Sequence, residues 1–210
     1  MIKAIIFDLD NCILDTHSLG EGILAPVLAP LYASGLPEEV KKGMSDALWD
    51  TAFEDAVAQN HVPENVADLM RVECRRLKIP EGRDIRSYGD EGYIQPLAVK
   101  KFLVTSGYRN FQNSKIEKLG IKSLFDEIII DEMDEPSARK KKKRIFEEIL
   151  KKNNLKKEEV LVVGDNPRSE LKAAKELDIT AVQTLRPGIK KWDEADYHIE
   201  SLSELSALIK

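Results

Sequence analysis

The segment Ile2-Lys-Ala-Ile-Ile-Phe-Asp-Leu-Asp-Asn-Cys-Ile-Leu-Asp-Thr16 decides the fold of this chain. Its residues 4–7 form an apolar run typical of a strand that is buried on both faces, and hence of a parallel sheet. Asp8 and Asp10 follow where such a strand ends, and open parallel sheets bind ligands at the carboxyl ends of their strands. Because two carboxylates this close repel each other, the pair indicates a divalent metal, one basic and one acidic carboxyl group, or both. The alternative is that the two aspartates only cap the strand and begin a turn.

Composition indicates an ordinary soluble globular protein. The chain has 210 residues, of which 42% are hydrophobic and 33% are charged, so it can bury a sizeable core. The formal net charge of -5 gives no overall basic field for a nucleic acid polymer or an anionic membrane. No apolar run approaches transmembrane length and no secretory signal pattern is present, so we expect a cytoplasmic protein. Cys12 and Cys74 are too few for a disulfide framework, and Cys12 is expected to be a packed small side chain.

Residues 17–88 predict an all-helical insertion. Apolar residues recur at helical spacing in four segments, and Pro37 and Pro63 suit the first turns of two of them. The four segments are Leu19 to Tyr32, Glu38 to Trp49, Ala52 to Gln59 and Glu64 to Leu77. In the last segment, Leu69, Val72 and Leu77 are expected to share one apolar face, with Val66 and Met70 nearby.

The second half of the chain alternates β and α segments, which is the pattern of a parallel sheet covered by helices on both faces. Strands are expected at residues 101–105, 125–131, 160–163, 179–184 and 197–199. Helices are expected at residues 110–119, 138–153 and 170–177, with a last helix ending at Ile209. The sequence therefore predicts an α/β core that the helical segment interrupts.

Polar residues follow three of the expected strands. Residues 4–7 lead to Asp8, residues 102–104 lead to Thr105-Ser106-Gly107, and residues 160–163 lead to Gly164-Asp165. If these strands are parallel neighbours, one sheet edge gathers carboxylates for a metal ion with hydroxyl and backbone N–H groups for an oxyanion. A phosphate with Mg²⁺ suits that mixture, because Mg²⁺ commonly combines one or two carboxylates with a phosphate oxygen.

A cation for the phosphate is available in the run of basic residues from Arg139 to Arg144. The apolar residues of the following helix place Lys141 and Lys142 on the buried face and Lys140 and Lys143 away from it. Charge runs are mostly solvated faces, so we expect one inward lysine at the start of the helix rather than a nucleic-acid-binding patch.

In chain order, these segments resemble the four motifs of the haloacid dehalogenase superfamily. The motifs are Phe7-Asp8-Leu9-Asp10 with residues 11–14, Leu103 to Gly107, a lysine that opens a helix, and Val162 to Asn166 with Glu170. The helical insertion lies where that superfamily places its helical cap, so the resemblance covers the chain from end to end. It implies a Rossmann-like three-layer parallel sheet core at residues 1–16 and 89–210, and a small helical cap at residues 17–88.

The resemblance also implies a mechanism. Asp8 would be the nucleophile that becomes an aspartyl phosphate, and Asp10 the general acid and base. Thr105, with backbone groups around Ser106, would bind the phosphoryl oxygens, and Lys142 would neutralise the developing charge. Lys141 and Lys140 remain alternatives, because the usual Lys-Pro or Gly-Lys pair is missing.

The implied metal is Mg²⁺. Asp8, the backbone carbonyl of Asp10 and Asp165 would coordinate it. Glu170 stands where an aspartate is commoner, so it would act from outside the ligand shell on a metal-bound water or on the lysine. Cys12 stands where the family commonly has threonine.

The function expected from the resemblance is Mg²⁺-dependent hydrolysis of a small soluble phosphomonoester by a monomer or homodimer. Thr105-Ser106-Gly107 with Gln112 and Lys115-Ile116 is similar to capped members that hydrolyse nucleoside monophosphates or sugar phosphates, and organic-acid phosphates belong to the same range. A 2-haloacid dehalogenase is one alternative, against which Asp10 counts, because displacement of halide needs no acid. A phosphomutase is another. A non-catalytic binding or regulatory module is the third, and the intact Asp8, Asp10, Thr105 and Asp165 count against it.

Overall fold

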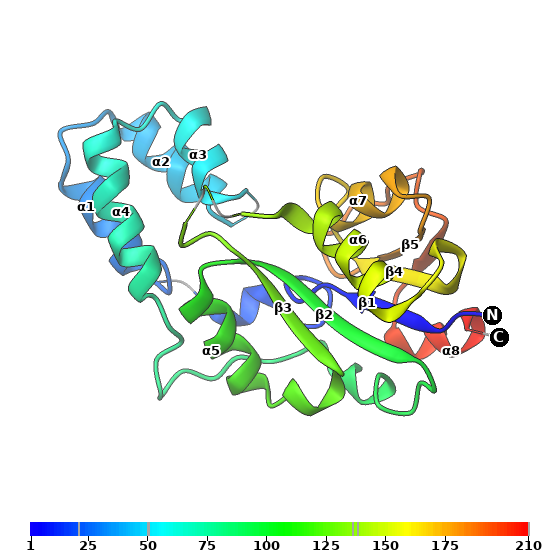
Figure 1. Ribbon diagram of the computed structural model, residues 1–210. Helices are drawn as coiled ribbons and strands as arrows, with labels where there is room; N and C mark the ends of the chain where they lie inside the picture. Colours follow the sequence, from blue (N-terminus) through cyan, green and yellow to red (C-terminus); the bar gives the residue numbers. More distant parts are fainter. Residues whose placement is uncertain (21, 50, 136, 138, 210) are drawn as a thin grey trace.

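One parallel sheet forms the centre of the molecule (Figure 1). The computed structural model describes residues 1–20, 22–49, 51–135, 137 and 139–209. Within these ranges the strand order is β3-β2-β1-β4-β5-β6, and every neighbouring pair is parallel. The strands are β1 (Ala4–Phe7), β2 (Lys100–Gly107), β3 (Glu127–Glu132), β4 (Val160–Gly164), β5 (Thr180–Thr184) and β6 (Tyr197–Ile199). The strand order reverses beside β1, and this is the place where open α/β sheets bind their ligands.

Helices cover both faces of the sheet. The helices of this part are α5 (Arg109–Leu119), α6 (Lys141–Asn153), α7 (Glu170–Glu176) and α8 (Leu205–Leu208). All four residues of β1 are buried, and successive side chains enter opposite layers: Ile5 and Phe7 pack toward α5 and α8, whereas Ala4 and Ile6 pack toward α6 and α7. The predicted three-layer α/β fold is confirmed, with boundaries that differ by a few residues. Residue 138, the expected start of the helix at residues 138–153, lies outside the described residues.

The helices between β1 and β2 form a separate bundle, which Figure 1 shows to one side of the sheet. They are α1 (Ala25–Ala33), α2 (Glu38–Ala47), α3 (Phe53–Gln59) and α4 (Glu64–Arg76). The bundle has its own apolar core, to which Tyr108 at the end of β2 also belongs. α1 begins later than expected because Thr16–Leu19 forms a 3₁₀ turn and Leu19 packs into the core beneath the sheet. Pro37 and Pro63 cap the starts of α2 and α4.

The expected apolar face of α4 is wrong in part. Leu69 is 58% exposed and Val72 is 38% exposed, whereas the buried side chains of this helix are Val66, Ala67, Met70 and Cys74. Met70 lies four residues after Val66 and three after Ala67, and Cys74 lies four after Met70, so the buried residues share one face of the helix and Leu69 and Val72 lie off it.

No helix in the described part of the chain has the length and apolar character needed to cross a membrane.

Candidate active site

The carboxyl ends of β1, β2 and β4 meet beneath the helical bundle. Phe7 is paired in register with Leu103 on one side and Val163 on the other, so the residues that follow these strands lie side by side. They line a cleft of about 1000 Å³ whose opposite wall comes from the bundle. Every site residue predicted from the sequence borders this cleft: Asp8, Asp10, Thr105, Ser106, Lys142 and Asp165.

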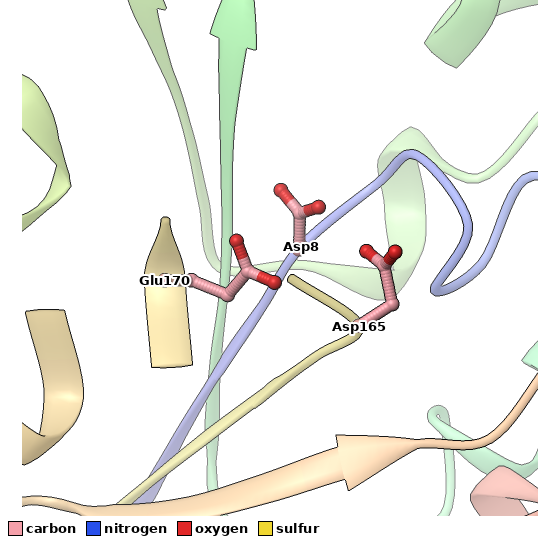
Figure 2. Close-up of side chains that lie close together, drawn as sticks. All are labelled: Asp8, Asp165 and Glu170. Atoms are coloured by element: carbon pink, nitrogen blue, oxygen red, sulfur yellow. The ribbon is translucent and has the colours of Figure 1, made fainter. Parts of the chain in front are cut away.

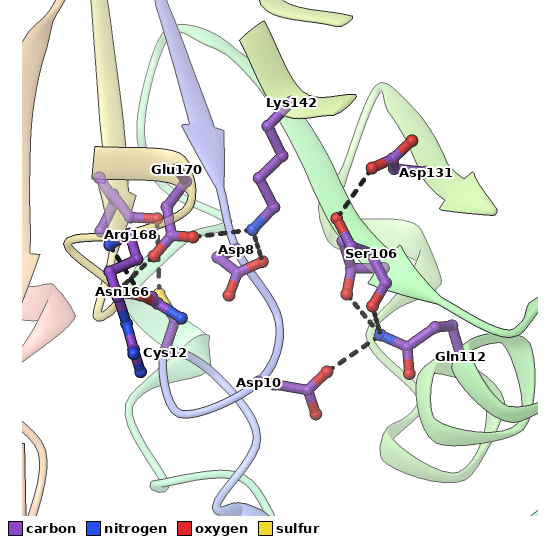
Figure 3. A network of polar contacts seen from close by, with 12 residues as sticks. Asp8, Asp10, Cys12, Ser106, Gln112, Asp131, Lys142, Asn166, Arg168 and Glu170 are labelled. Carbon is purple, nitrogen blue, oxygen red and sulfur yellow. Dashed lines mark hydrogen bonds and ion pairs between the residues drawn. The ribbon is translucent and has the colours of Figure 1, made fainter. Parts of the chain in front are cut away.

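Lys142 enters the cleft from the start of α6 (Figure 3). Its side chain is 6% exposed, and its Nζ donates to Asp8 Oδ1 at 2.7 Å and to Glu170 Oε2 at 2.8 Å. Burial disfavours the charged lysine, but the charges of Asp8 and Glu170 outweigh it and raise the pKa of Lys142 above its ordinary value. Lys142 therefore stays a cation between two carboxylates.

The other lysines of the run point elsewhere. Lys140 is exposed and pairs with Glu148, and Lys143 is exposed and pairs with Glu176. Lys141 is also exposed, so the expectation that it shares the inward face is wrong. Its φ of 64° departs from helical geometry, so the helical phase read from Ile145 does not extend back to it.

Three carboxylates converge next to Lys142 (Figure 2). Asp8, Asp165 and Glu170 each offer an oxygen, and these oxygens lie within 4.8 Å of one another. Burial, opposed by Lys142 and reinforced by Glu170, raises the pKa of Asp8 to about 7. Burial and the charges of Glu170 and Asp8 raise the pKa of Asp165 to about 8. No hydrogen bond from a described residue reaches the Asp165 carboxylate, so this corner of the site carries more negative charge than its lysine balances.

This donor set fits a divalent cation. Hard oxygen ligands and a surplus of negative charge are what Mg²⁺ requires. Glu170 is less free to bind it than the two aspartates, because Oε1 accepts from the Asn166 N–H at 2.6 Å and Oε2 from Lys142. Gly164 makes this position possible: a Cβ there would lie 2.4 Å from Glu170 Oε1.

Two side chains of α5 hold the Asp10 carboxylate. Its Oδ1 accepts from Lys115 Nζ at 2.7 Å, and its Oδ2 accepts from Gln112 Nε2 at 2.9 Å. Gln112 Nε2 also donates to Thr105 Oγ1 at 2.5 Å and to the Ser106 carbonyl at 3.1 Å. Because Thr105 Oγ1 accepts this bond, its own hydroxyl proton stays available for a ligand in the cleft.

Asp131, at the end of β3, anchors the segment that carries Lys142. Its Oδ1 accepts from the N–H groups of Lys140 and Lys141, and its Oδ2 accepts from Arg139 Nε at 3.1 Å. Ser106 Oγ donates to the same carboxylate at 3.2 Å, so the Ser106 hydroxyl is directed toward Asp131. The sequence analysis missed this role, although an acidic residue at the end of a predicted strand was the available signal.

Arg186 stabilises the loop after β1 through hydrogen bonds to a backbone carbonyl of that loop. Its Nε and Nη2 donate to the Cys12 carbonyl at 3.0 and 2.7 Å, and its Nη1 and Nη2 donate to the two carboxylate oxygens of Asp90. The guanidinium also lies 4.4 Å from the ring centre of Tyr88. Cys12 itself is buried, which raises the pKa of its thiol, and the thiol contacts the Val163 carbonyl, as expected for a packing residue. Nothing in the sequence pattern singled out Arg186.

Comparisons with known proteins bear on the family of this chain. The family model described as haloacid dehalogenase-like hydrolase matches residues 5–184. A protein of Methanocaldococcus jannaschii named glyceraldehyde 3-phosphate phosphatase is 27% identical over 229 residues, which cover 100% of this chain and 98% of that protein.

Solved structures share the fold. The HAD phosphatase of Thermococcus onnurineus is 23% identical with a TM-score of 0.68, over 99% of this chain and 98% of that one. YfnB of Bacillus subtilis, whose structure is bound to magnesium, is 16% identical with a TM-score of 0.64, over 100% and 99% of the two chains. 2-Haloacid dehalogenases are also among the similar structures.

Proposed function

Since the chain belongs to the haloacid dehalogenase-like hydrolase family, we propose that it is a phosphatase that cleaves a small phosphomonoester and requires Mg²⁺. The observation that carries the proposal is the placement of Lys142 between Asp8 and Glu170, with Asp10 and Thr105 lining the same cleft. A buried nucleophile, a fixed cation and a second carboxylate within one cleft are the components that phosphoryl transfer through a covalent intermediate needs.

The chain's own residues account for the steps. An oxygen of Asp8 attacks phosphorus, and the bond from phosphorus to the ester oxygen breaks. Asp10 gives a proton to that departing oxygen and then takes one from the water that attacks the aspartyl phosphate, which releases inorganic phosphate. Lys142 and the Thr105 hydroxyl stabilise the charge on the phosphoryl oxygens.

Mg²⁺ would be held by Asp8, Asp165 and the backbone carbonyl of Asp10, with Glu170 supporting Lys142. Bound there, it would neutralise the carboxylates and a phosphoryl oxygen, so that Asp8 is ionised and able to attack. The raised pKa values of Asp8 and Asp165 support this assignment, because burial and the neighbouring carboxylates disfavour the charged forms that a bound cation would favour.

Asp10 favours a phosphatase over a 2-haloacid dehalogenase. Displacement of halide from carbon needs no proton donor, whereas an alkoxide leaving group does. Here Asp10 borders the cleft with a side chain that is 29% exposed, so a substrate's leaving group has access to it.

The cleft supports a substrate with an organic body. Its bundle side is largely apolar and includes Val27, Trp49 and Phe53. A volume of about 1000 Å³ lies at the upper end of the range for ligand pockets and accommodates a sugar phosphate, an organic-acid phosphate or a nucleoside monophosphate. The name of the M. jannaschii relative makes glyceraldehyde 3-phosphate the first compound to assay. We further propose a cytoplasmic monomer or homodimer whose partner is a small phosphorylated metabolite, and neither a nucleic acid polymer nor a membrane.

The decisive experiment is a panel of phosphate esters assayed with purified protein. Turnover of 4-nitrophenyl phosphate and of at least one metabolite is expected with Mg²⁺, to be lost with chelator and restored less well by Ca²⁺, whose looser and higher coordination misplaces the phosphoryl group. Equal rates in chelator would exclude the metal assignment. Inertness toward every ester would favour a binding module that keeps the fold without the chemistry.

A further inference from the structure

Lys115 on α5 has a role that the proposed mechanism leaves open. It is 5% exposed, although a lysine is almost never buried without a counter-charge. The one carboxylate that contacts its Nζ among the described residues is Asp10, at 2.7 Å. Its Nζ also lies 4.3 Å from the ring centre of Phe111, one helical turn earlier.

Gln112 supports the same carboxylate from the same helix. It is 1% exposed, and its Nε2 reaches the second oxygen of Asp10. Lys115 and Gln112 therefore each donate to a different oxygen of Asp10, and together they fix the position and the rotation of its carboxylate. Figure 3 shows Asp10 directed toward Gln112 and away from the group formed by Asp8, Lys142 and Glu170.

A carboxylate in this position needs such a restraint. Asp8 and Asp165 leave a surplus of negative charge that attracts a cation, and an unrestrained Asp10 side chain two residues from Asp8 would be drawn to the same cation. A carboxylate bound to a cation cannot donate a proton to a leaving group. The restraint thus separates the proton-transfer residue from the groups that handle the phosphoryl oxygens.

We propose that Lys115, assisted by Gln112, is a positioning residue that holds the Asp10 carboxylate on the Thr105 side of the cleft, where it transfers protons. The inference rests on the proposed phosphatase function. In the first step the phosphorus–oxygen bond to the leaving group breaks and Asp10 supplies its proton; in the second, Asp10 accepts a proton from the attacking water. Lys115 exchanges no proton in either step.

The test compares leaving groups in Lys115→Met and in wild type, with Mg²⁺ and with 4-nitrophenyl phosphate and glycerol phosphate as probes. For glycerol phosphate, kcat/KM should fall by about 10² or more, the usual contribution of general acid–base catalysis. For 4-nitrophenyl phosphate, whose leaving group needs little protonation, the fall should be less than about tenfold. Intact mass during turnover of the aryl ester should show a phosphorylated protein, because attack of water also needs Asp10.

Control variants separate positioning from a structural role. Lys115→Arg keeps the charge, so its kcat/KM for glycerol phosphate should be close to that of wild type. Lys118→Met removes an exposed lysine of the same helix, so kcat/KM should stay unchanged for both substrates. Gln112→Leu, which removes the second bond without stranding a buried cation, should give the same substrate pattern with a smaller loss. If Lys115→Met does not fold, the comparison of the two substrates in Gln112→Leu still tests the inference.

A double-mutant cycle completes the test. In an Asp10→Asn background, Lys115→Met should cost no further activity toward glycerol phosphate, because the residue it positions is already inactive. The inference would be overturned if the losses of activity in the two single variants added in the double variant. It would also be overturned if Lys115→Met lowered kcat/KM equally for both substrates and raised KM. In either case, turnover by the wild type would still support the phosphatase function. Wild-type inertness toward all esters would overturn both.

Discussion

Among the buried cations that contact the loop from Asp8 to Cys12, Arg186 and Lys142 lie in surroundings that differ. Arg186 is matched: its guanidinium pairs with both oxygens of Asp90 and donates to the Cys12 and Glu200 carbonyls. Lys142 supplies one positive charge among three carboxylates, those of Asp8, Glu170 and Asp165, and it pairs with only the first two. Burial, together with repulsion among these carboxylates, raises the pKa of Asp8 to about 7 and the pKa of Asp165 to about 8.

This difference in charge balance indicates that the Arg186 cluster has a structural role and the Lys142 cluster a chemical one. A buried ion pair whose hydrogen bonds are all satisfied holds a conformation and leaves nothing for a ligand. A buried site with surplus charge is unstable by itself and becomes stable when a ligand or ion supplies the missing charge. The Arg186 cluster should therefore govern stability and the Lys142 cluster activity.

The largest expected effect is at the nucleophile. Asp8→Asn keeps the size of the side chain but removes the attacking carboxylate, so turnover of any phosphate ester should fall to background. Asp10→Asn should still attack 4-nitrophenyl phosphate and then hydrolyse the aspartyl phosphate slowly. Intact mass after incubation with Mg²⁺ should show added phosphate on the Asp10 variant and none on the Asp8 variant. Phosphate on Asp8→Asn would refute the nucleophile and place reactivity elsewhere in the cleft.

The second effect tests the matched cluster. Arg186→Met leaves Asp90 buried without its partner, and breaking a buried pair in this way typically costs about 3–5 kcal/mol of the free energy of unfolding. Urea denaturation monitored by circular dichroism measures it. Lys157→Met, which removes an exposed partner of Asp178, is the control and should change stability far less. A small loss in Arg186→Met would mean that the cluster is not a structural one.

The third effect tests the unmatched cluster. Lys142→Ala should lower kcat by about 10²–10³, the usual loss when a preorganised charge is removed from an active site. Lys143→Ala, one position along the same helix and exposed beside Glu176, is the matched control and should be close to wild type. Steady-state kinetics with 4-nitrophenyl phosphate measures both. A greater loss in Lys140→Ala or Lys141→Ala would contradict the assignment of the site lysine.

Sequence patterns predicted the sheet region better than the bundle. The strands β1, β2 and β4 were predictable, because an apolar run followed by polar residues reflects burial and exposure directly. The strand order was not predictable, because pairing between distant strands leaves no local mark. In α4 the apolar residues outnumber the buried positions, so Leu69 and Val72 could not be excluded from the core by pattern alone.

Within the site, helical phase led to Lys142 but failed for Lys141, where the backbone leaves helical geometry at the helix start. Asp131, Lys115 and Arg186 owe their positions to contacts across 10, 105 and 174 residues of sequence, respectively. Such long-range contacts follow from the tertiary arrangement. Sequence patterns could point to Asp131 at the end of a predicted strand and to Lys115 by resemblance, but the partners of all three residues could be recognised only once the fold was known.

The smallest expected effect is on thermal stability, and it tests whether a cation completes the Lys142 cluster. Between about pH 4 and pH 8 the folded protein binds more protons at Asp8 and Asp165 than the unfolded chain, because both pKa values are raised above 3.8. The free energy of unfolding of the metal-free protein should therefore fall as pH rises through this window. Mg²⁺ replaces the lost protons, so the increase in Tm that it causes should be larger at pH 8 than at pH 5. A shift of a few degrees is expected, since about 1 kcal/mol moves the Tm of a chain this size by roughly 2–4 °C.

Differential scanning calorimetry at matched ionic strength measures this shift in Tm. Asp165→Asn is expected to weaken the pH dependence, and Asp178→Asn, at an exposed pair, to leave it unchanged. An increase in Tm as large at pH 5 as at pH 8 would show that Mg²⁺ does not bind these carboxylates, and the surplus charge would then need another partner.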